Sequence, residues 1–159
     1  MSTMAFTQKS IFDIARSGSV NDVKHLMQIN PDTINSIAAS GYSPLILACY
    51  NGNTQVAQFL AEHVTNINGT SKYGTPLMAA VYKNDSIITQ KLLQLKANPN
   101  TADVNGTTPL HYAVIARNNA LIKLLIAAGA RTDAKDNRGN TAKDYALMTK
   151  SASIIEIIN

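Results

Sequence analysis

The sequence contains a single cysteine and no long apolar run, and each of these two features excludes a class of protein. A single thiol, Cys49, cannot form an internal disulfide and is typical of a reducing compartment, so we expect a cytoplasmic protein. No apolar run approaches the roughly 20 residues that a membrane-spanning helix needs, and the polar first residues lack the apolar core of a signal peptide. We therefore expect neither membrane insertion nor secretion.

Charge is also scarce, since charged residues make up 15% of the chain against 45% hydrophobic residues. This balance argues against disorder, and 159 residues suffice for one domain with a sizeable core. The net charge of +4 comes from lysines and arginines scattered among acidic residues, which is weak evidence for nucleic-acid binding.

A phased repeat organises most of the chain. Intervals of 32, 33 and 33 residues separate four matching positions, Pro44, Pro76, Pro109 and Ala142. Asparagine or aspartate recurs in the same rhythm, at Asn35, Asn68, Asn100 and Asp133. A period near 33 residues indicates a solenoid of stacked units.

The clearest copy of the repeat runs from Gly106 to Asp136 and contains the run G-T-T-P-L-H-Y-A. Its pattern predicts a turn, a short helix, a longer amphipathic helix, a glycine stop and an extended loop. The first copy predicts two short helices joined at Gly18, followed by an extended connection that begins at Ile34.

These residues resemble the ankyrin repeat family, whose pattern is G-x-T-P-L-H-x-A-A, an outer helix and a closing G-A-D-V-N. The resemblance covers residues 10–159 and implies an all-α solenoid of helix-turn-helix units joined by β-turn loops. The implied units are 10–40, 41–73, 74–105, 106–138 and 139–159, with the first and last as caps, after a flexible segment at 1–9. Asn84 and Arg117 replace the glycine between the two helices, and one residue is missing before Gly74.

No constellation in the sequence indicates catalysis or metal binding. Cys49 lies on a helix that is usually buried in the family, and the three histidines fall in different units without metal-ligand spacing. The family resemblance implies that Thr108 and His111 brace a turn, and Asp103 and Asp136 are more typical of turn caps than of acid–base groups. We therefore expect no enzyme activity, no metal and no cofactor.

The resemblance also implies a partner-binding surface, formed by the turn tips and the exposed ends of the first helices; we call it the concave surface. Carrying the family's positions over gives Tyr42, Tyr50, Asn51, Lys72, Tyr73, Tyr82, Lys83, Val104, Asn105, Thr107, Ile115 and Arg138. This set holds four of the six tyrosines, a residue type enriched at interface hot spots, whereas Tyr112 and Tyr145 occupy positions that are normally half-buried. The set includes Lys72 and Lys83, so we expect an adaptor that binds an acidic-rimmed protein partner.

Three alternatives stay open at this point. The tyrosine rings could simply cover neighbouring units. The chain could bind nucleic acid or anions through its basic residues, Lys72, Lys83, Arg117, Lys123, Arg131 and Arg138. It could also be a regulatory subunit that associates through the isoleucine-rich end at Ile154–Ile158, although we expect a monomer.

Overall fold

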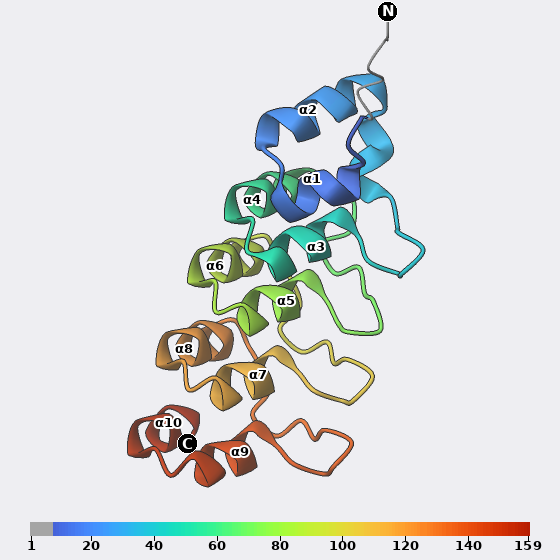
Figure 1. Ribbon diagram of the computed structural model, residues 1–159. Helices are drawn as coiled ribbons and strands as arrows, with labels where there is room; N and C mark the ends of the chain where they lie inside the picture. Colours follow the sequence, from blue (N-terminus) through green and yellow to red (C-terminus); the bar gives the residue numbers. More distant parts are fainter. Residues whose placement is uncertain (1–7) are drawn as a thin grey trace, which may run out of the picture.

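The computed structural model describes residues 8–159, which form ten α-helices and one 3-10 helix (Figure 1). Most of the flexible segment predicted for residues 1–9 lies outside the described residues. The elements are α1 (Ile11–Ser17), α2 (Val20–Ile29), η1 (Pro31–Asn35), α3 (Pro44–Asn51), α4 (Thr54–His63), α5 (Pro76–Tyr82), α6 (Ser86–Gln94), α7 (Pro109–Ile115), α8 (Asn119–Ala127), α9 (Ala142–Thr149) and α10 (Ala152–Ile158).

The helices stand in two columns. Helices α1, α3, α5, α7 and α9 form the inner column, and helices α2, α4, α6, α8 and α10 form the outer column, with contacts between successive helices in each. The long loops project from the inner column on the side away from the outer helices (Figure 1). This arrangement confirms the predicted all-α solenoid.

Helix starts and ends follow the predicted local signals. The Ser43 hydroxyl accepts the Ile46 N–H at 3.2 Å, directly before the proline that opens α3. Gly52 ends α3 with φ of 71°, and Asn84 and Arg117 take the same left-handed conformation with φ of 57° and 55°. The substitutions for glycine therefore preserve the turn geometry at a cost of about 1 kcal/mol each.

The extended connection predicted from Ile34 is wrong. Residues Pro31–Asn35 instead form η1, because proline presets φ at the first position and the Asn30 side-chain oxygen accepts the Asp32 N–H at 3.1 Å. The short helix turns Ile34 into the core, where its side chain is 2% exposed. Ile34 therefore adds a buried apolar side chain to the core of the first unit.

One register of the inner helices carries small buried side chains, and one register of the outer helices carries large ones. Ala48, Ala80 and Ala113 are fully buried at one register of the inner helices, where a larger side chain would force neighbouring helices apart. Leucines at one register of the outer helices are also 0% exposed: Leu60, Leu92 and Leu125. The adjacent Leu93 and Leu124, which the apolar stripe also places toward this layer, are only half-buried because they lie at its edge.

The recurring asparagines link one unit to the next. Each side-chain oxygen accepts a backbone N–H about thirty residues further along the chain, at 2.7 to 2.9 Å. The pairs are Asn35 with Thr65, Asn68 with Asn98, and Asn100 with Arg131. These bonds hold the loops in register and explain why the asparagines share the repeat period.

Candidate binding surface

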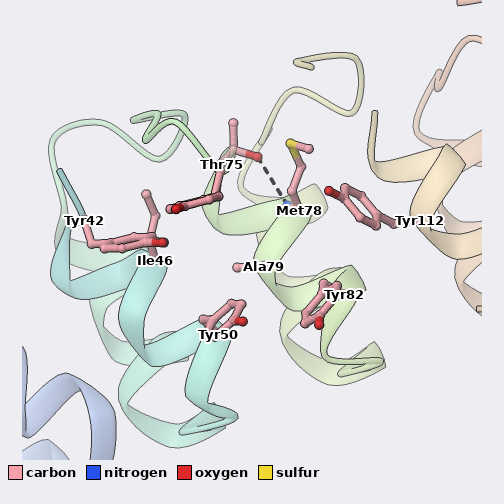
Figure 2. Close-up of a pocket in the computed structure, with 9 residues that line it drawn as sticks. Tyr42, Ile46, Tyr50, Thr75, Met78, Ala79, Tyr82 and Tyr112 are labelled. Carbon is pink, nitrogen blue, oxygen red and sulfur yellow. Dashed lines mark hydrogen bonds between the residues drawn. The ribbon is translucent and has the colours of Figure 1, made fainter. Parts of the chain in front are cut away.

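A hollow of about 460 Å³ opens on the concave surface where the second, third and fourth units meet (Figure 2). We call it the tyrosine pocket. Its lining consists of Tyr42, Ile46, Tyr50, Tyr73, Thr75, Met78, Ala79, Tyr82 and Tyr112. All four tyrosines of the predicted surface therefore line a single cavity, together with one tyrosine that was expected only to be half-buried.

The pocket exists because the third unit carries a small residue at one register of the inner helix. The fourth and fifth units place Tyr112 and Tyr145 three residues after the first helical position, and the third unit places Ala79 there. Tyr112 donates to Asp103 at 2.8 Å and Tyr145 donates to Asp136 at 2.6 Å. No aspartate occurs in the loop before α5, and the missing ring leaves the space open above Ala79.

The tyrosine rings are arranged in pairs, one between the loops before α3 and α5 and the others between successive inner helices. Tyr42 stacks on Tyr73 with centroids 5.7 Å apart and planes at 9°. Tyr50 stacks on Tyr82 at 5.6 Å and 3°, and Tyr82 meets Tyr112 edge-on at 6.0 Å and 88°. Tyr50, Tyr73 and Tyr82 nevertheless keep 51%, 57% and 57% of their surface exposed. The rings thus cover neighbouring units and still offer contact area to solvent.

The apolar floor of the pocket depends on a tight loop. Ser71 and Gly74 exchange backbone hydrogen bonds of 2.9 and 3.0 Å, which closes the turn whose loop is one residue short. Gly74 has φ of +107°, and a Cβ there would lie 2.4 Å from the Met78 sulfur. The backbone angle therefore favours glycine, and any other residue there would also have to move the end of the Met78 side chain in the floor.

The lining is uncharged at neutral pH. Burial, together with the neighbouring Tyr73 and Tyr50, raises the pKa of Tyr42. Burial and the Asp103 carboxylate raise the pKa of Tyr112 to about 12, so both groups are neutral phenols. The nearby positive charges come from lysines: the Lys72 ammonium lies 4.8 Å from the centroid of the Tyr73 ring, and Lys83 directly follows Tyr82.

Four other predicted residues line a second hollow of about 290 Å³ between the fourth and fifth units, which we call the polar hollow. They are Asn105, Thr107, Ile115 and Arg138, and the remaining lining residues are Tyr112, Asp136, Asn137 and Tyr145. Tyr112 contributes to both hollows. The predicted surface is therefore divided into an aromatic part and a polar part.

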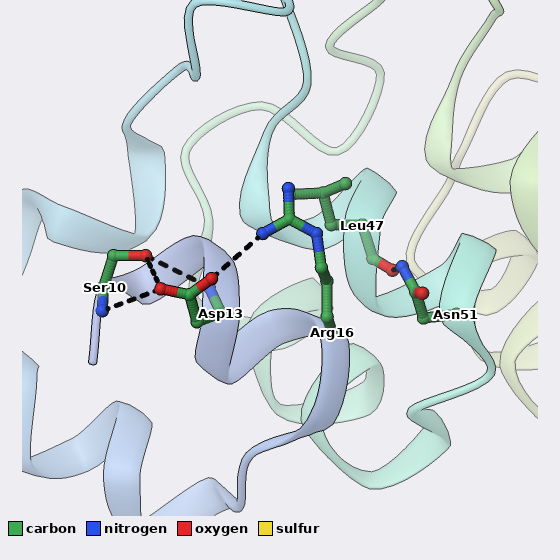
Figure 3. Close-up of polar contacts among 5 residues, drawn as sticks. All are labelled: Ser10, Asp13, Arg16, Leu47 and Asn51. Carbon is green, nitrogen blue, oxygen red and sulfur yellow. Dashed lines mark hydrogen bonds and ion pairs between the residues drawn. The ribbon is translucent and has the colours of Figure 1, made fainter.

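The last four predicted residues lie outside both linings. Asn51 is exposed, and its side-chain N–H donates to the Leu47 carbonyl at 2.8 Å (Figure 3). The neighbouring helix α1 carries an ion pair of its own, between Arg16 and Asp13 (Figure 3). Val104 is 64% exposed at a loop tip, and its carbonyl accepts the Asn137 side-chain N–H at 2.9 Å. Lys72 and Lys83 are exposed beside the tyrosine pocket.

Sequence reasoning missed the floor of the tyrosine pocket, Ile46, Thr75, Met78 and Ala79, because these residues match the buried positions of the repeat. A comparison between units could have revealed it. The register that holds tyrosine in the fourth and fifth units holds alanine in the third, and this change predicts a cavity beside that helix.

The groups that could suggest catalysis have structural partners. The Thr108 N–H donates to Nδ1 of His111 at 3.1 Å, and Nε2 lies 3.2 Å from the Asn140 carbonyl, so the imidazole braces the turn as expected. Oδ1 of Asp103 accepts the N–H groups of Asn105 and Thr107 at 2.8 and 3.0 Å, as predicted for a turn cap. Burial raises the pKa of the Cys49 thiol, so this thiol is a weak nucleophile.

Metal-ligating side chains do not gather in the described residues, since no three of His, Cys, Asp or Glu lie close enough together to hold a metal ion. Across residues 8–159, no helix combines the length and the apolarity that crossing a membrane requires.

The residues behind the two other functional hypotheses are dispersed or buried. The Arg117 guanidinium donates to the Thr149 carbonyl at 3.1 Å, Arg131 pairs with Asp133, and Lys123 lies on the outer helix α8. In the isoleucine-rich end, Ile154 and Ile158 are 1% and 6% exposed. Core packing therefore accounts for these two isoleucines, and Ile155 and Ile157 are half-buried against the same core.

Comparison with known proteins agrees with this architecture. A family model described as ankyrin repeats (3 copies) matches residues 11–103 and 77–158. The chain is 32% identical over 95 residues to human BCL-6 corepressor-like protein 1, covering 59% of this chain and 5% of that protein. It is 31% identical over 100 residues to Ankyrin repeat and SAM domain-containing protein 6 of Rattus norvegicus, covering 62% of this chain and 11% of that protein. It therefore matches only a small part of each relative. The chain belongs to the ankyrin repeat family, whose repeats are in general non-catalytic modules that bind other proteins.

Proposed function

We propose that this chain is an adaptor module that binds a partner protein on its concave surface, with the tyrosine pocket at the centre of the contact. The observation that carries the proposal is the convergence of five tyrosines from three units on one uncharged cavity. Large amphipathic rings above an apolar floor supply the contact area and hydrogen-bonding groups typical of interface hot spots.

Rigidity supports the same function. The ring stacks hold Tyr50 and Tyr82 before any partner arrives, and the asparagine bonds between units hold the loops. A preorganised surface loses little side-chain entropy on binding, so more of the contact free energy contributes to affinity.

The proposal is tested by affinity capture with three versions of the chain: the parent, the double variant Tyr50→Ala/Tyr82→Ala, and a matched control. The control is Ile29→Ala/Ile87→Ala, which removes side chains that are 65% and 62% exposed on the outer helices α2 and α6. We expect the parent and the control to retain the same partner protein and the tyrosine variant to lose it. Thermal melts first establish that all three versions fold.

A partner that binds the folded tyrosine variant as tightly as the parent would show that the tyrosine pocket is not the binding site. Loss of the partner in the isoleucine control alone would place the contact on the outer helices instead.

A further inference from the structure

We infer that the tyrosine pocket receives one large apolar side chain of a partner polypeptide that carries acidic residues on both sides of this anchor. The inference rests on the proposed function and adds the chemistry of the partner. Three features of the pocket support it: the composition of its floor, the positions of its lysines and the use of its ring faces.

The floor selects an apolar group. Ile46, Met78 and Ala79 are 3%, 1% and 7% exposed, so their packing is complete before a ligand enters. The Thr75 hydroxyl already accepts the Met78 N–H at 3.3 Å, so this polar group of the lining has a partner. A cavity of about 460 Å³ has room for an aromatic or large aliphatic side chain, whose burial would release water from the exposed tyrosine rings that surround the floor.

The lysines select acidic flanks. Lys72 directly precedes Tyr73, a member of one ring stack, and Lys83 directly follows Tyr82, a member of the other. The two cations are therefore next to different walls of the pocket. Within residues 8–159 neither lysine forms an ion pair. Carboxylates on either side of an inserted anchor would meet these charges without competing with a carboxylate of the chain itself.

The ring faces disfavour a cation in the pocket. A cage for an ammonium group offers open ring faces, but here four rings are stacked in two pairs, and the Lys72 ammonium already lies over Tyr73. The lining contains no carboxylate. Asp103, which contacts the lining through the Tyr112 hydroxyl, also accepts backbone N–H groups. A methylated lysine or an arginine would therefore be repelled by the lysines without a compensating anion.

NMR titration with synthetic peptides of equal length tests the inference. The first peptide has a central phenylalanine flanked by aspartate and glutamate, the second has alanine in place of phenylalanine, and the third has lysine and arginine flanks. A fourth has a central trimethyllysine and neutral flanks. We expect the first peptide to shift amide signals of α3, α5 and α7, and the alanine peptide to bind roughly ten- to hundredfold more weakly.

Two variants connect binding to the pocket. Ala79→Tyr fills the cavity with the residue that the fourth and fifth units carry at this register, so the scaffold should accept it, and it should abolish binding of the first peptide. Lys72→Glu/Lys83→Glu should weaken that peptide about two- to thirtyfold. The control Lys96→Glu/Lys123→Glu makes the same charge change at exposed positions outside the pocket and should leave the affinity unchanged.

The inference is overturned if the basic or the trimethyllysine peptide binds as well as the acidic peptide. It is also overturned if the acidic peptide shifts no pocket signals at millimolar concentration, or if the pocket and control charge variants behave alike. These outcomes are separable from failure of the proposed function, because a partner captured by the parent and lost by Tyr50→Ala/Tyr82→Ala would still identify the concave surface as the binding site.

Discussion

Replacing Leu92 by alanine should strongly destabilise the array without affecting the concave surface. Leu92 lies on α6, in the middle of the outer column, and its side chain is 0% exposed. Helix α6 packs against α4 on one side and α8 on the other, so a void at this position weakens the interfaces with both neighbouring units.

The magnitude follows from the atoms that are removed. Leucine to alanine deletes three buried carbons, which is worth about 2.4 kcal/mol at roughly 0.8 kcal/mol for each carbon. The cavity left behind increases the loss, so we expect a decrease of about 3 kcal/mol in the free energy of unfolding, within a usual range of about 2–5 kcal/mol. For a chain of this length the melting temperature should fall by roughly 6–12 °C.

Urea and thermal denaturation followed by circular dichroism measure this change, and the same helix provides the control. Ile87 is 62% exposed on α6, so Ile87→Ala should alter the free energy of unfolding by less than about 0.5 kcal/mol. A loss below about 1 kcal/mol for Leu92→Ala, or equal losses for both variants, would refute the assignment of Leu92 to the core.

Other predictions concern individual polar groups and the cysteine. Cys49 should not react with a thiol-specific reagent in the native protein and should react after unfolding in urea, because burial raises its pKa; rapid native labelling, followed by absorbance, would contradict this. The hydrogen bond from Tyr145 and those from backbone N–H groups lower the pKa of Asp136, so its stabilisation is present above the unfolded pKa of about 3.9 and is lost as pH falls through the folded pKa. Between pH values of about 5 and 3, the parent should therefore lose stability more steeply in urea titrations than Asp136→Asn, and equal slopes would contradict this. His111→Ala should destabilise the protein by about 1–3 kcal/mol for each buried group left unpaired, including the Thr108 N–H; a loss below about 0.5 kcal/mol in urea denaturation would show that the brace is dispensable.

The scaffold could be predicted because its signals are local and recur. Each proline start, capping hydroxyl and left-handed turn acts within a few residues, and the repeat shows which signals belong together. The error at Ile34 has a comparable cause. Proline at position 31 ends α2, but the capping oxygen of Asn30 allows a further short helix before the loop.

The candidate surface was predictable only in part. The family resemblance implied exposed inner-helix positions such as Tyr50 and Tyr82, and both side chains are exposed. The cavity depends on neighbouring units, because it combines the small Ala79 of the third unit with the Tyr112 ring of the fourth. The repeat pattern of a single unit marks Ala79 as a core residue, and only comparison with Tyr112 and Tyr145 at the same register indicates the space above it.

The short loop at Gly74 has a consequence for how binding strength could be tuned. Met78 forms part of the floor of the tyrosine pocket, and the space beside its sulfur is free because position 74 carries no side chain. A Cβ at that position would lie 2.4 Å from the Met78 sulfur, so any larger residue would have to displace this side chain and alter the floor. If the proposed function holds, ligand selectivity is thus coupled to position 74, a residue outside the lining that acts on the pocket only through Met78.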